Sequence, residues 1–161
     1  MNACNRTLWL FGRSAAGKTT IAEAIKEAMP QFVILDGDRV RILLNHWDFS
    51  EKARQSHLRY MAVTARMLNE SNIPVLATFI TPTQRSREQI KAIIPWVKFV
   101  WVNCTLEVLR RRDTKGLYAK KPNGLLDFEV PIVDFNYRLD THKQKLDESV
   151  ASLLRYIEET T

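Results

Sequence analysis

The stretch Thr7-Leu8-Trp9-Leu10-Phe11-Gly12-Arg13-Ser14-Ala15-Ala16-Gly17-Lys18-Thr19 decides the fold of this 161-residue chain. Its last eight residues read G-x-x-x-x-G-K-T and follow an apolar run. The glycines let backbone N–H groups turn toward phosphate groups, Lys18 adds a positive charge, and the Thr19 hydroxyl can bind Mg²⁺. The motif requires a preceding strand and a following helix, which the sequence predicts over 7–11 and 19–29. It therefore predicts the phosphate-binding loop of a nucleotide triphosphatase or kinase, in preference to an ordinary glycine-rich turn.

Length and composition indicate one domain over residues 1–161, because the chain is long enough for one hydrophobic core and too short for two. No apolar run approaches the ~18 residues of a membrane span, and the first residues lack the pattern of a signal peptide. We therefore expect no membrane partner and a cytoplasmic location. Cys4 and Cys104 form no C-x-x-C motif, and we interpret them as reduced thiols.

The net charge of +6 is compatible with either nucleic acid or a polyanionic small molecule as a partner. Six of the basic residues gather near one acid, Asp113: Arg110, Arg111, Arg112, Lys115, Lys120 and Lys121. Apart from Tyr118, no aromatic side chains are interleaved among them as stacking platforms. This pattern favours a lid over nucleotide phosphates, at about 113–133, over a nucleic-acid surface.

Apolar runs alternate with helical patterns along the whole chain. After the first strand and helix, strands are expected at 32–35, 73–79, 97–102 and 137–139. Helices are expected at about 51–69, 83–94, 105–112 and 144–157, with Ser50 as the cap of the longest. Near-continuous apolar strands separated by helices are typical of a parallel sheet that is buried on both faces. The fold class is therefore a three-layer α/β P-loop NTPase fold with a parallel five-stranded sheet, a short lid and ligands at the carboxyl ends of the strands.

An acidic turn, Asp36-Gly37-Asp38, ends the second strand. In such a sheet this turn lies beside the phosphate loop, where one carboxylate can orient the metal shell while the other accepts a proton from an attacking hydroxyl. Arg41 can hold an anionic acceptor. An Asp-Gly turn that merely joins a strand to a helix is the alternative, but the neighbouring phosphate loop favours the functional interpretation.

Beyond these two motifs, the chain resembles the adenylylsulfate (APS) kinases. The shared segments are the phosphate loop, Leu35-Asp36-Gly37-Asp38-x-Val40-Arg41, Phe49-Ser50 with Arg54, Thr78-Phe79-Ile80-Thr81-Pro82, Arg112-Asp113-Thr114-Lys115-Gly116-Leu117-Tyr118, Phe128-Glu129-Val130-Pro131 and Asp140-Thr141. The resemblance covers nearly the whole chain in order. It implies a kinase that moves the γ-phosphoryl group of MgATP to the ribose 3′-hydroxyl of a nucleotide carrying a second anionic group.

The resemblance also implies roles for individual residues, with ATP and Mg²⁺ as cofactors. Asp38 is the expected base, Asp36 and Thr19 hold the metal shell, and Lys18 and Lys115 neutralise the transferred group. The expected ATP-binding residues are Gly12, Arg13, Ser14, Ala15, Ala16, Gly17, Lys18, Thr19 and Arg112. The expected acceptor-binding residues are Asp38, Arg41, Arg54, His57, Phe79, Ile80, Thr81, Lys115, Gly116, Leu117 and Phe128.

The departures from the family pattern concentrate where the acceptor base binds. Ile42 and Leu43 replace the usual aromatic or His and Gly, and His57 replaces an Asn. The lid between Tyr118 and Phe128 is short: Ala119-Lys120-Lys121-Pro122-Asn123 leads directly to Gly124, without the usual segment whose Phe helps to sandwich adenine. This pattern leaves open an acceptor other than APS, as in the cytidine diphosphoramidate kinases of capsule pathways, which resemble this family. Alternatively, Ile42, Phe79 and Phe128 form a different adenine slot.

Three further questions stay open on the sequence alone. The chain could be a small-metabolite or antibiotic kinase, or a non-enzymatic nucleotide-gated module, although the paired aspartates speak against the module. His57 is either part of the acceptor pocket or solvated, and Trp47 could touch a ligand because it follows the acidic turn. A homodimer is one alternative for the assembly.

Overall fold

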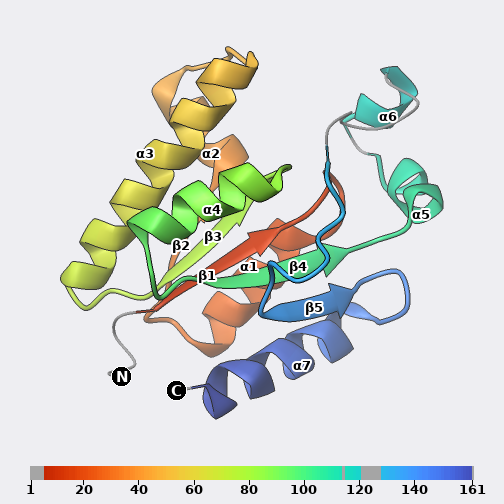
Figure 1. Cartoon of the computed structure of the whole chain (residues 1–161). Helices are drawn as coiled ribbons and strands as arrows, with labels where there is room; N and C mark the ends of the chain where they lie inside the picture. The colour runs from red at the N-terminus through yellow and green to blue at the C-terminus, as the bar shows by residue number, and fades with distance from the viewer. Residues whose placement is uncertain (1–5, 114, 121–127, 161) are drawn as a thin grey trace.

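The computed structural model of the chain describes residues 6–113, 115–120 and 128–160. At its centre lies a five-stranded sheet in the order β2-β3-β1-β4-β5, and every neighbouring pair is parallel. The strands span Thr7–Phe11 (β1), Val33–Asp36 (β2), Val75–Phe79 (β3), Lys98–Asn103 (β4) and Tyr137–Asp140 (β5). The predicted α/β fold with a parallel five-stranded sheet is confirmed (Figure 1).

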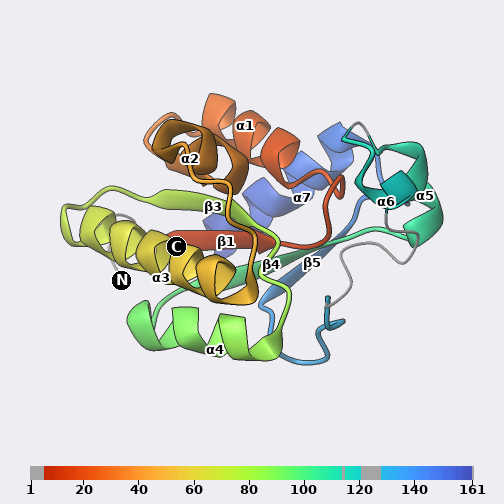
Figure 2. The same ribbon diagram turned by 90° about the horizontal axis from the view of Figure 1, so that it is seen from above.

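Helices cover both faces of this sheet (Figure 2). One face carries α1 (Lys18–Ala28) and α7 (Leu146–Glu159), and the other carries α3 (Glu51–Glu70) and α4 (Gln84–Ile93). Strands β1 and β3 are buried along their whole length because they have helices on both sides. Three layers therefore enclose two hydrophobic cores, one on each side of the sheet.

Local sequence signals set the starts of two of these helices. The Ser50 hydroxyl accepts a hydrogen bond of 3.3 Å from the Ala53 N–H and caps α3, as predicted. The Thr83 hydroxyl caps α4 in the same way through the Ser86 N–H, at 3.1 Å. The predicted ranges of these two helices differ from the observed ones by at most one residue at each end.

The segment Gly37–Leu44 forms a helix, α2, that the sequence analysis does not predict. The side chain of Asp36 accepts a hydrogen bond of 3.0 Å from the Arg39 N–H, so the acidic turn is the capped first turn of this helix. Its apolar residues Ile42, Leu43 and Leu44 are 62%, 77% and 61% exposed, and the one buried residue of the helix is Arg41. Hydrophobic periodicity gives no signal here, because no apolar stripe faces a core.

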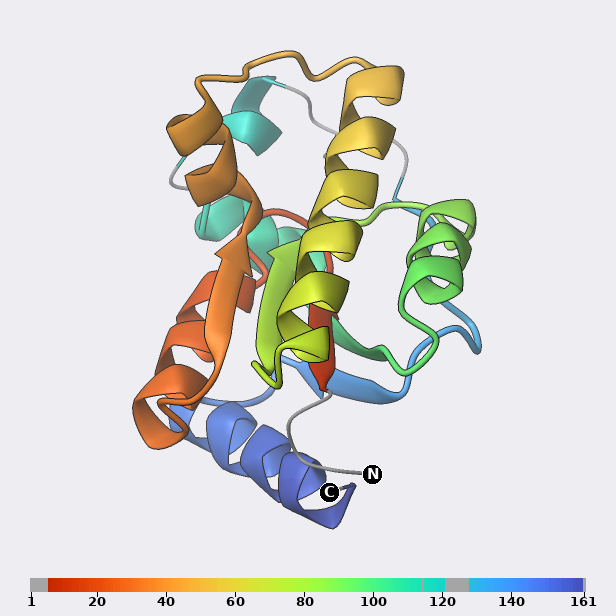
Figure 3. The ribbon, with the colours of Figure 1, turned by 90° about the vertical axis from the view of Figure 1, so that its left-hand side faces the viewer.

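After β4 come α5 (Leu106–Arg111) and the short α6 (Leu117–Lys120), and α6 lies within the predicted lid at 113–133. Figures 1 and 3 place α6 beyond the carboxyl ends of the strands, at the same end of the molecule as the start of α3. The predicted short lid segment at 121–124, together with Cys4, lies outside the described residues. Cys104, which is described, is buried and free. Among the described residues, no helix is both long and apolar enough to cross a membrane.

Candidate active site

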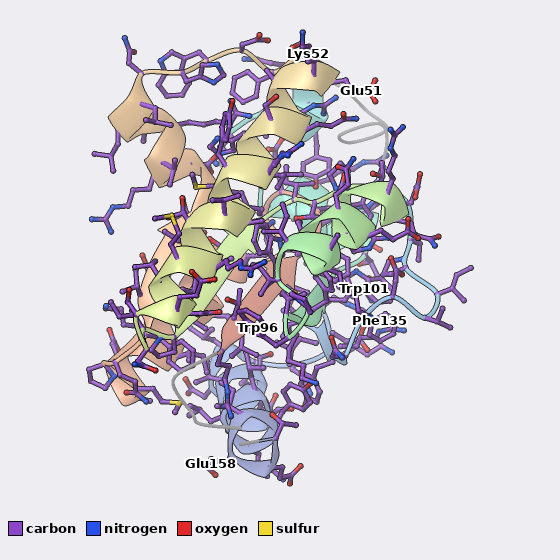
Figure 4. All side chains as sticks on the ribbon, turned by 60° about the vertical axis from the view of Figure 1, so that its left-hand side comes forward. Glu51, Lys52, Trp96, Trp101, Phe135 and Glu158 are labelled. Atoms are coloured by element: carbon purple, nitrogen blue, oxygen red, sulfur yellow. The ribbon has the colours of Figure 1, made fainter. Side chains whose placement is uncertain are left out.

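A cavity of about 1100 Å³ opens at the carboxyl ends of the strands. Its walls come from the phosphate loop, the start of α2, the amino-terminal half of α3, the segment after β3, the lid and the start of α7. In Figure 4, Glu51 and Lys52 mark the start of α3 at the cavity end, while Glu158 marks the opposite end of the molecule. One continuous space therefore adjoins both predicted halves of the site.

The phosphate loop has the backbone that its glycines predict. Gly17 has φ 105° at the start of α1, and Gly12 has φ 154°. A Cβ atom on Gly12 would lie 2.3 Å from the carbonyl oxygen of Val102, so no side chain fits there. Lys18 Nζ donates to the carbonyl oxygens of Gly12 and Arg13, at 3.0 and 2.8 Å. Burial lowers the pKa of Lys18 to about 8.

Asp36 is held by three donors at the edge of this loop. The hydroxyls of Thr19 and Thr78 both donate to its Oδ2 at 2.7 Å, and the Arg39 N–H donates to its Oδ1. Burial acts to raise the pKa of Asp36, but these hydrogen bonds and one from the Asp38 backbone outweigh it and lower the pKa. The acidic turn therefore lies beside the phosphate loop, as predicted, with Asp36 ionised.

Asp38 forms an ion pair with Lys115 of the lid. Its charge also acts on Lys18 and on Arg41, which places it within electrostatic range of cations in both halves of the cavity. Arg112 donates to the carbonyl oxygen of Thr141 at 2.8 Å, and the Thr141 hydroxyl donates to the Ala16 carbonyl at the same distance.

A tyrosine joins the lid to the phosphate loop. The Tyr118 hydroxyl donates a hydrogen bond of 2.7 Å to the carbonyl oxygen of Ser14. Burial raises the pKa of Tyr118 to about 12, so the hydroxyl keeps its proton at neutral pH. The Asp113 carboxylate accepts from the N–H groups of Leu117 and Tyr118, at 2.9 and 2.7 Å, and fixes the start of α6. The lid segment that carries Lys115 therefore contacts the phosphate loop directly, through Tyr118.

The acceptor half of the cavity is lined by Arg41, Arg54, His57 and Phe79. Arg41 is only 6% exposed and donates to the carbonyl oxygens of His46 and Asp48. His57 is also 6% exposed, and its ring lies edge-on to Phe79 with centroids 5.7 Å apart. Burial and the charge of Arg41 lower its pKa. The structure therefore places His57 in the cavity wall and not in solvent.

The segment after β3 forms the floor of this half. Thr81 adopts φ 46°, a left-handed conformation that is uncommon for a β-branched residue. Its hydroxyl accepts from Trp9 Nε1 at 2.8 Å and its carbonyl accepts from Arg87 at 3.1 Å. The Ile80 carbonyl accepts from the Gly12 N–H at 3.3 Å. These contacts link the acceptor floor to the phosphate loop.

Most of the predicted site residues line the cavity, but four do not. Gly12 is packed against the carbonyl oxygen of Val102, and Gly116 lies just before α6 with φ 64°. Phe128 is 9% exposed, stacks on Phe11, lies under the guanidinium of Arg13 at 5.3 Å, and with Arg13 lines a separate small depression. Of the three residues expected to form an alternative adenine slot, Ile42 and Phe79 line the cavity in this structure.

Several cavity residues lack a role in the sequence prediction. They include Thr78, Thr141, Trp47 and Phe49. Thr78, Phe49 and Thr141 lie inside the motifs shared with the APS kinases, so the resemblance could have identified them as site residues. For Trp47, the only indication in the sequence was its position after the acidic turn.

The model of the adenylylsulphate kinase family matches residues 4–142 of the chain. An adenylyl-sulfate kinase of Geotalea uraniireducens is 34% identical over 166 residues, covering 94% of this chain and 79% of that protein. One from Lactiplantibacillus plantarum is 35% identical, covering 94% and 80%. Among solved structures, the Mycobacterium tuberculosis APS kinase CysC in complex with AMPPNP and APS superposes with a TM-score of 0.86 at 25% identity, covering 95% of this chain and 97% of that one. A gluconokinase from Sinorhizobium meliloti, with a TM-score of 0.66 and 20% identity, shares the fold.

Proposed function

The chain belongs to the adenylylsulphate kinase family and is an ATP-dependent kinase with a hydroxyl acceptor, and from that premise we propose that its acceptor is APS. The reaction moves the γ-phosphoryl group of ATP to the ribose 3′-hydroxyl of APS. We propose that residues 1–161 act as one kinase domain with a lid at 113–133, in the cytoplasm where ATP is supplied. A small nucleotide is the partner, with no nucleic acid.

One observation supports the proposal above the others: Asp38 lies in a single cavity between the cations of the phosphate loop and those of the acceptor half. A phosphoryl transfer needs its donor and acceptor to be positioned together, with charge neutralised around the transferred group. Lys18 and Lys115 neutralise the phosphoryl oxygens. Arg41 and Arg54 hold the anionic groups of the acceptor, and Asp38 accepts the proton of the attacking hydroxyl.

Thr19 and Asp36 suit Mg²⁺ because a hydroxyl and an ionised carboxylate are the hard oxygen donors that this ion prefers. When bound with the triphosphate, the ion neutralises charge on the phosphate oxygens. The Thr19 hydroxyl donates its one hydrogen bond to Asp36, which leaves the lone pairs of the hydroxyl oxygen available to bind the metal ion. Asp36 therefore orients Thr19 as well as the metal shell.

A second acceptor has one observation in its favour. Phe128, which the resemblance assigns to the acceptor site, packs on Phe11 away from the cavity. The sequence between Tyr118 and Phe128 also lacks the longer family segment. A kinase for a nucleotide such as cytidine diphosphoramidate is therefore the competing proposal.

Steady-state kinetics separate the two acceptors. The enzyme is assayed with MgATP and either APS, cytidine diphosphoramidate or simple nucleoside diphosphates, and the 3′-phosphorylated products are quantified. We expect the highest kcat/KM with APS. A higher kcat/KM with cytidine diphosphoramidate refutes APS as the acceptor, and ATP consumption without any 3′-phosphorylated nucleotide refutes both.

A further inference from the structure

The phosphate loop contains a tight turn at 13–16. The Ala16 N–H donates to the Arg13 carbonyl oxygen at 3.3 Å, which closes a four-residue turn. Ala15, the third residue of this turn, has φ 65°, whereas the φ of Ser14, the second, is not positive. This combination is a type II turn, whose third residue is usually Gly or Asn because a Cβ atom disfavours the left-handed conformation. Contacts with the rest of the chain therefore have to hold Ala15 in it.

The Tyr118 hydroxyl supplies such a contact. It donates a hydrogen bond of 2.7 Å to the carbonyl oxygen of Ser14. Type I and type II turns differ by a rotation of about 180° of the central peptide, which here joins Ser14 to Ala15. The hydrogen bond forms only while the Ser14 carbonyl points toward the tyrosine. It therefore stabilises the type II orientation against the type I orientation.

The orientation of this peptide decides where the Ala15 N–H points. The peptide is trans, and a trans peptide is planar, with its C=O and N–H directed to opposite sides. The Ala15 N–H therefore faces away from Tyr118. Ser14 and Ala15 line the cavity and Tyr118 does not, so the N–H is directed to the cavity side of the loop. Within the part of the chain that the structure describes, this N–H has no hydrogen-bond partner.

We propose that the Tyr118 hydroxyl is a positioning group for the phosphates of ATP, because it directs the Ala15 N–H toward them. Backbone N–H groups are the donors with which a phosphate loop surrounds phosphate oxygens. With the peptide rotated, the Ser14 carbonyl oxygen would face the cavity, and it would repel a phosphate group. This inference rests on the kinase activity of the proposed function and not on the identity of the acceptor.

A structural role for Tyr118 would reside in its ring, whereas the proposed role resides in its hydroxyl. The side chain is 4% exposed and belongs to the core on the α1 side of the sheet. The Tyr118 N–H donates to the Asp113 carboxylate at 2.7 Å, so the protein holds both the ring and the main chain. Phe in place of Tyr118 keeps the ring and removes only the donor, which separates the two roles.

The test compares Tyr118→Phe with the unaltered enzyme and with a matched control, Tyr137→Phe. The Tyr137 hydroxyl likewise donates to a main-chain carbonyl, that of Ser152, but Tyr137 does not line the cavity. Calorimetry measures the affinity for AMPPNP in the presence of Mg²⁺, without an acceptor. We expect Tyr118→Phe to weaken binding by about 2- to 12-fold, which corresponds to one hydrogen bond. Tyr137→Phe should leave the affinity unchanged.

The variant Ala15→Gly provides a second comparison. Glycine adopts the left-handed conformation without a steric cost, so the type II turn then needs less support from Tyr118. We therefore expect Tyr118→Phe to cost less affinity when it is combined with Ala15→Gly than when it is made alone. An equal loss in both backgrounds would show that the hydroxyl acts on something other than this turn, and it would overturn the inference.

The amide signal of Ala15 in a nuclear magnetic resonance spectrum gives a readout that does not depend on affinity. In isotope-labelled unaltered enzyme, its proton should move downfield when MgAMPPNP binds, because it then donates to a phosphate oxygen. The shift should be smaller in saturated Tyr118→Phe and unchanged in Tyr137→Phe. An Ala15 signal that does not move in the unaltered enzyme overturns the inference, even if Tyr118→Phe fails to fold.

The failure of this inference is distinguishable from the failure of the proposed function. The experiment uses the ATP analogue alone, so its result is the same whichever nucleotide is the acceptor. If the unaltered enzyme does not bind MgAMPPNP, the kinase function and the inference fail together. If it binds, and folded Tyr118→Phe binds as tightly as Tyr137→Phe, the kinase function stands and the positioning role of Tyr118 is refuted.

Discussion

The Thr78 hydroxyl donates a hydrogen bond of 2.7 Å to Oδ2 of Asp36, the same oxygen that accepts from Thr19. Thr78 lies opposite Asp36 in the parallel pairing of β2 and β3, so the sheet register itself creates this contact. Thr78 is 3% exposed, so a water molecule cannot take the place of its hydroxyl as a donor to Asp36 without a local rearrangement. The carboxylate that orients Thr19 is therefore positioned by the neighbouring strand.

Thr78→Val is expected to lower kcat by about tenfold or more, because a hydrogen bond to a charged group is worth ~1.5–3 kcal/mol. The loss of this donor raises the pKa of Asp36, since hydrogen bonds are what lower it. The acid limb of the pH–rate profile should therefore move to higher pH, and half-maximal activity should need more Mg²⁺. Thr78→Ser retains the hydroxyl and serves as the control. A reduced kcat with an unmoved acid limb would point to a packing defect.

Binding of MgAMPPNP is expected to weaken as the pH rises above about 8, the pKa of Lys18 in this structure. Negative phosphate groups beside the ammonium favour its charged form and raise that pKa. Below pH 8 Lys18 already carries its proton and the affinity is flat. Above pH 8, Lys18 is mostly neutral in the free protein and takes up a proton when the analogue binds, so the affinity falls by up to about tenfold per pH unit.

Calorimetry between pH 7 and 9.5 measures this dependence, and buffers of different ionisation enthalpy report the proton uptake. Lys18→Ala should bind the analogue weakly and without the change near pH 8. A flat wild-type profile up to pH 9.5 would show that Lys18 does not titrate in the site.

Asp38→Ala is expected to lower single-turnover phosphoryl transfer by about 10²–10⁴-fold, the usual contribution of a positioned acid or base. The substitution also removes the partner of Lys115. AMPPNP affinity therefore has to be measured alongside, to separate a lid effect from the loss of the base. Asp38→Asn keeps the size of the side chain and should be nearly as slow. Turnover within threefold of the unaltered enzyme would show that the base is assigned wrongly.

The sequence predicts those features that depend on interactions between residues close together in the chain or on the parallel topology of the sheet. The α3 boundaries depend on a local cap and on 3.6-residue periodicity, and the prediction of 51–69 matches Glu51–Glu70 closely. The contact between the acidic turn and the phosphate loop follows from parallel topology alone. Helix α2 has no buried apolar stripe, so hydrophobic periodicity does not predict it. The packing of Phe128 on Phe11 joins residues far apart in the sequence, so no local pattern predicts it.

Arg87 is the clearest case of a residue whose burial and contacts cannot be predicted from the sequence pattern. It lies in a polar helix, α4, and its sequence context is that of a solvated surface residue. The structure shows it 2% exposed, over the ring of Phe11 at 4.9 Å, paired with Asp134 and bonded to the Thr81 carbonyl. Two distant segments, those of Phe11 and Asp134, have to meet α4 before these contacts exist.

Arg87→Leu is expected to lower the free energy of unfolding by about 3–5 kcal/mol, because it leaves Asp134 and the Thr81 carbonyl without their partner. Urea denaturation measures the change. Arg111→Ala is the control, since its pair with Glu107 joins side chains that are 69% and 82% exposed and is worth less than about 1 kcal/mol. The double variant Arg87→Leu/Asp134→Leu should regain part of the loss, because no uncompensated charge remains. If Arg87→Leu proved as stable as the unaltered protein, Thr81 would have to be held in its left-handed conformation by Trp9 and the local backbone alone.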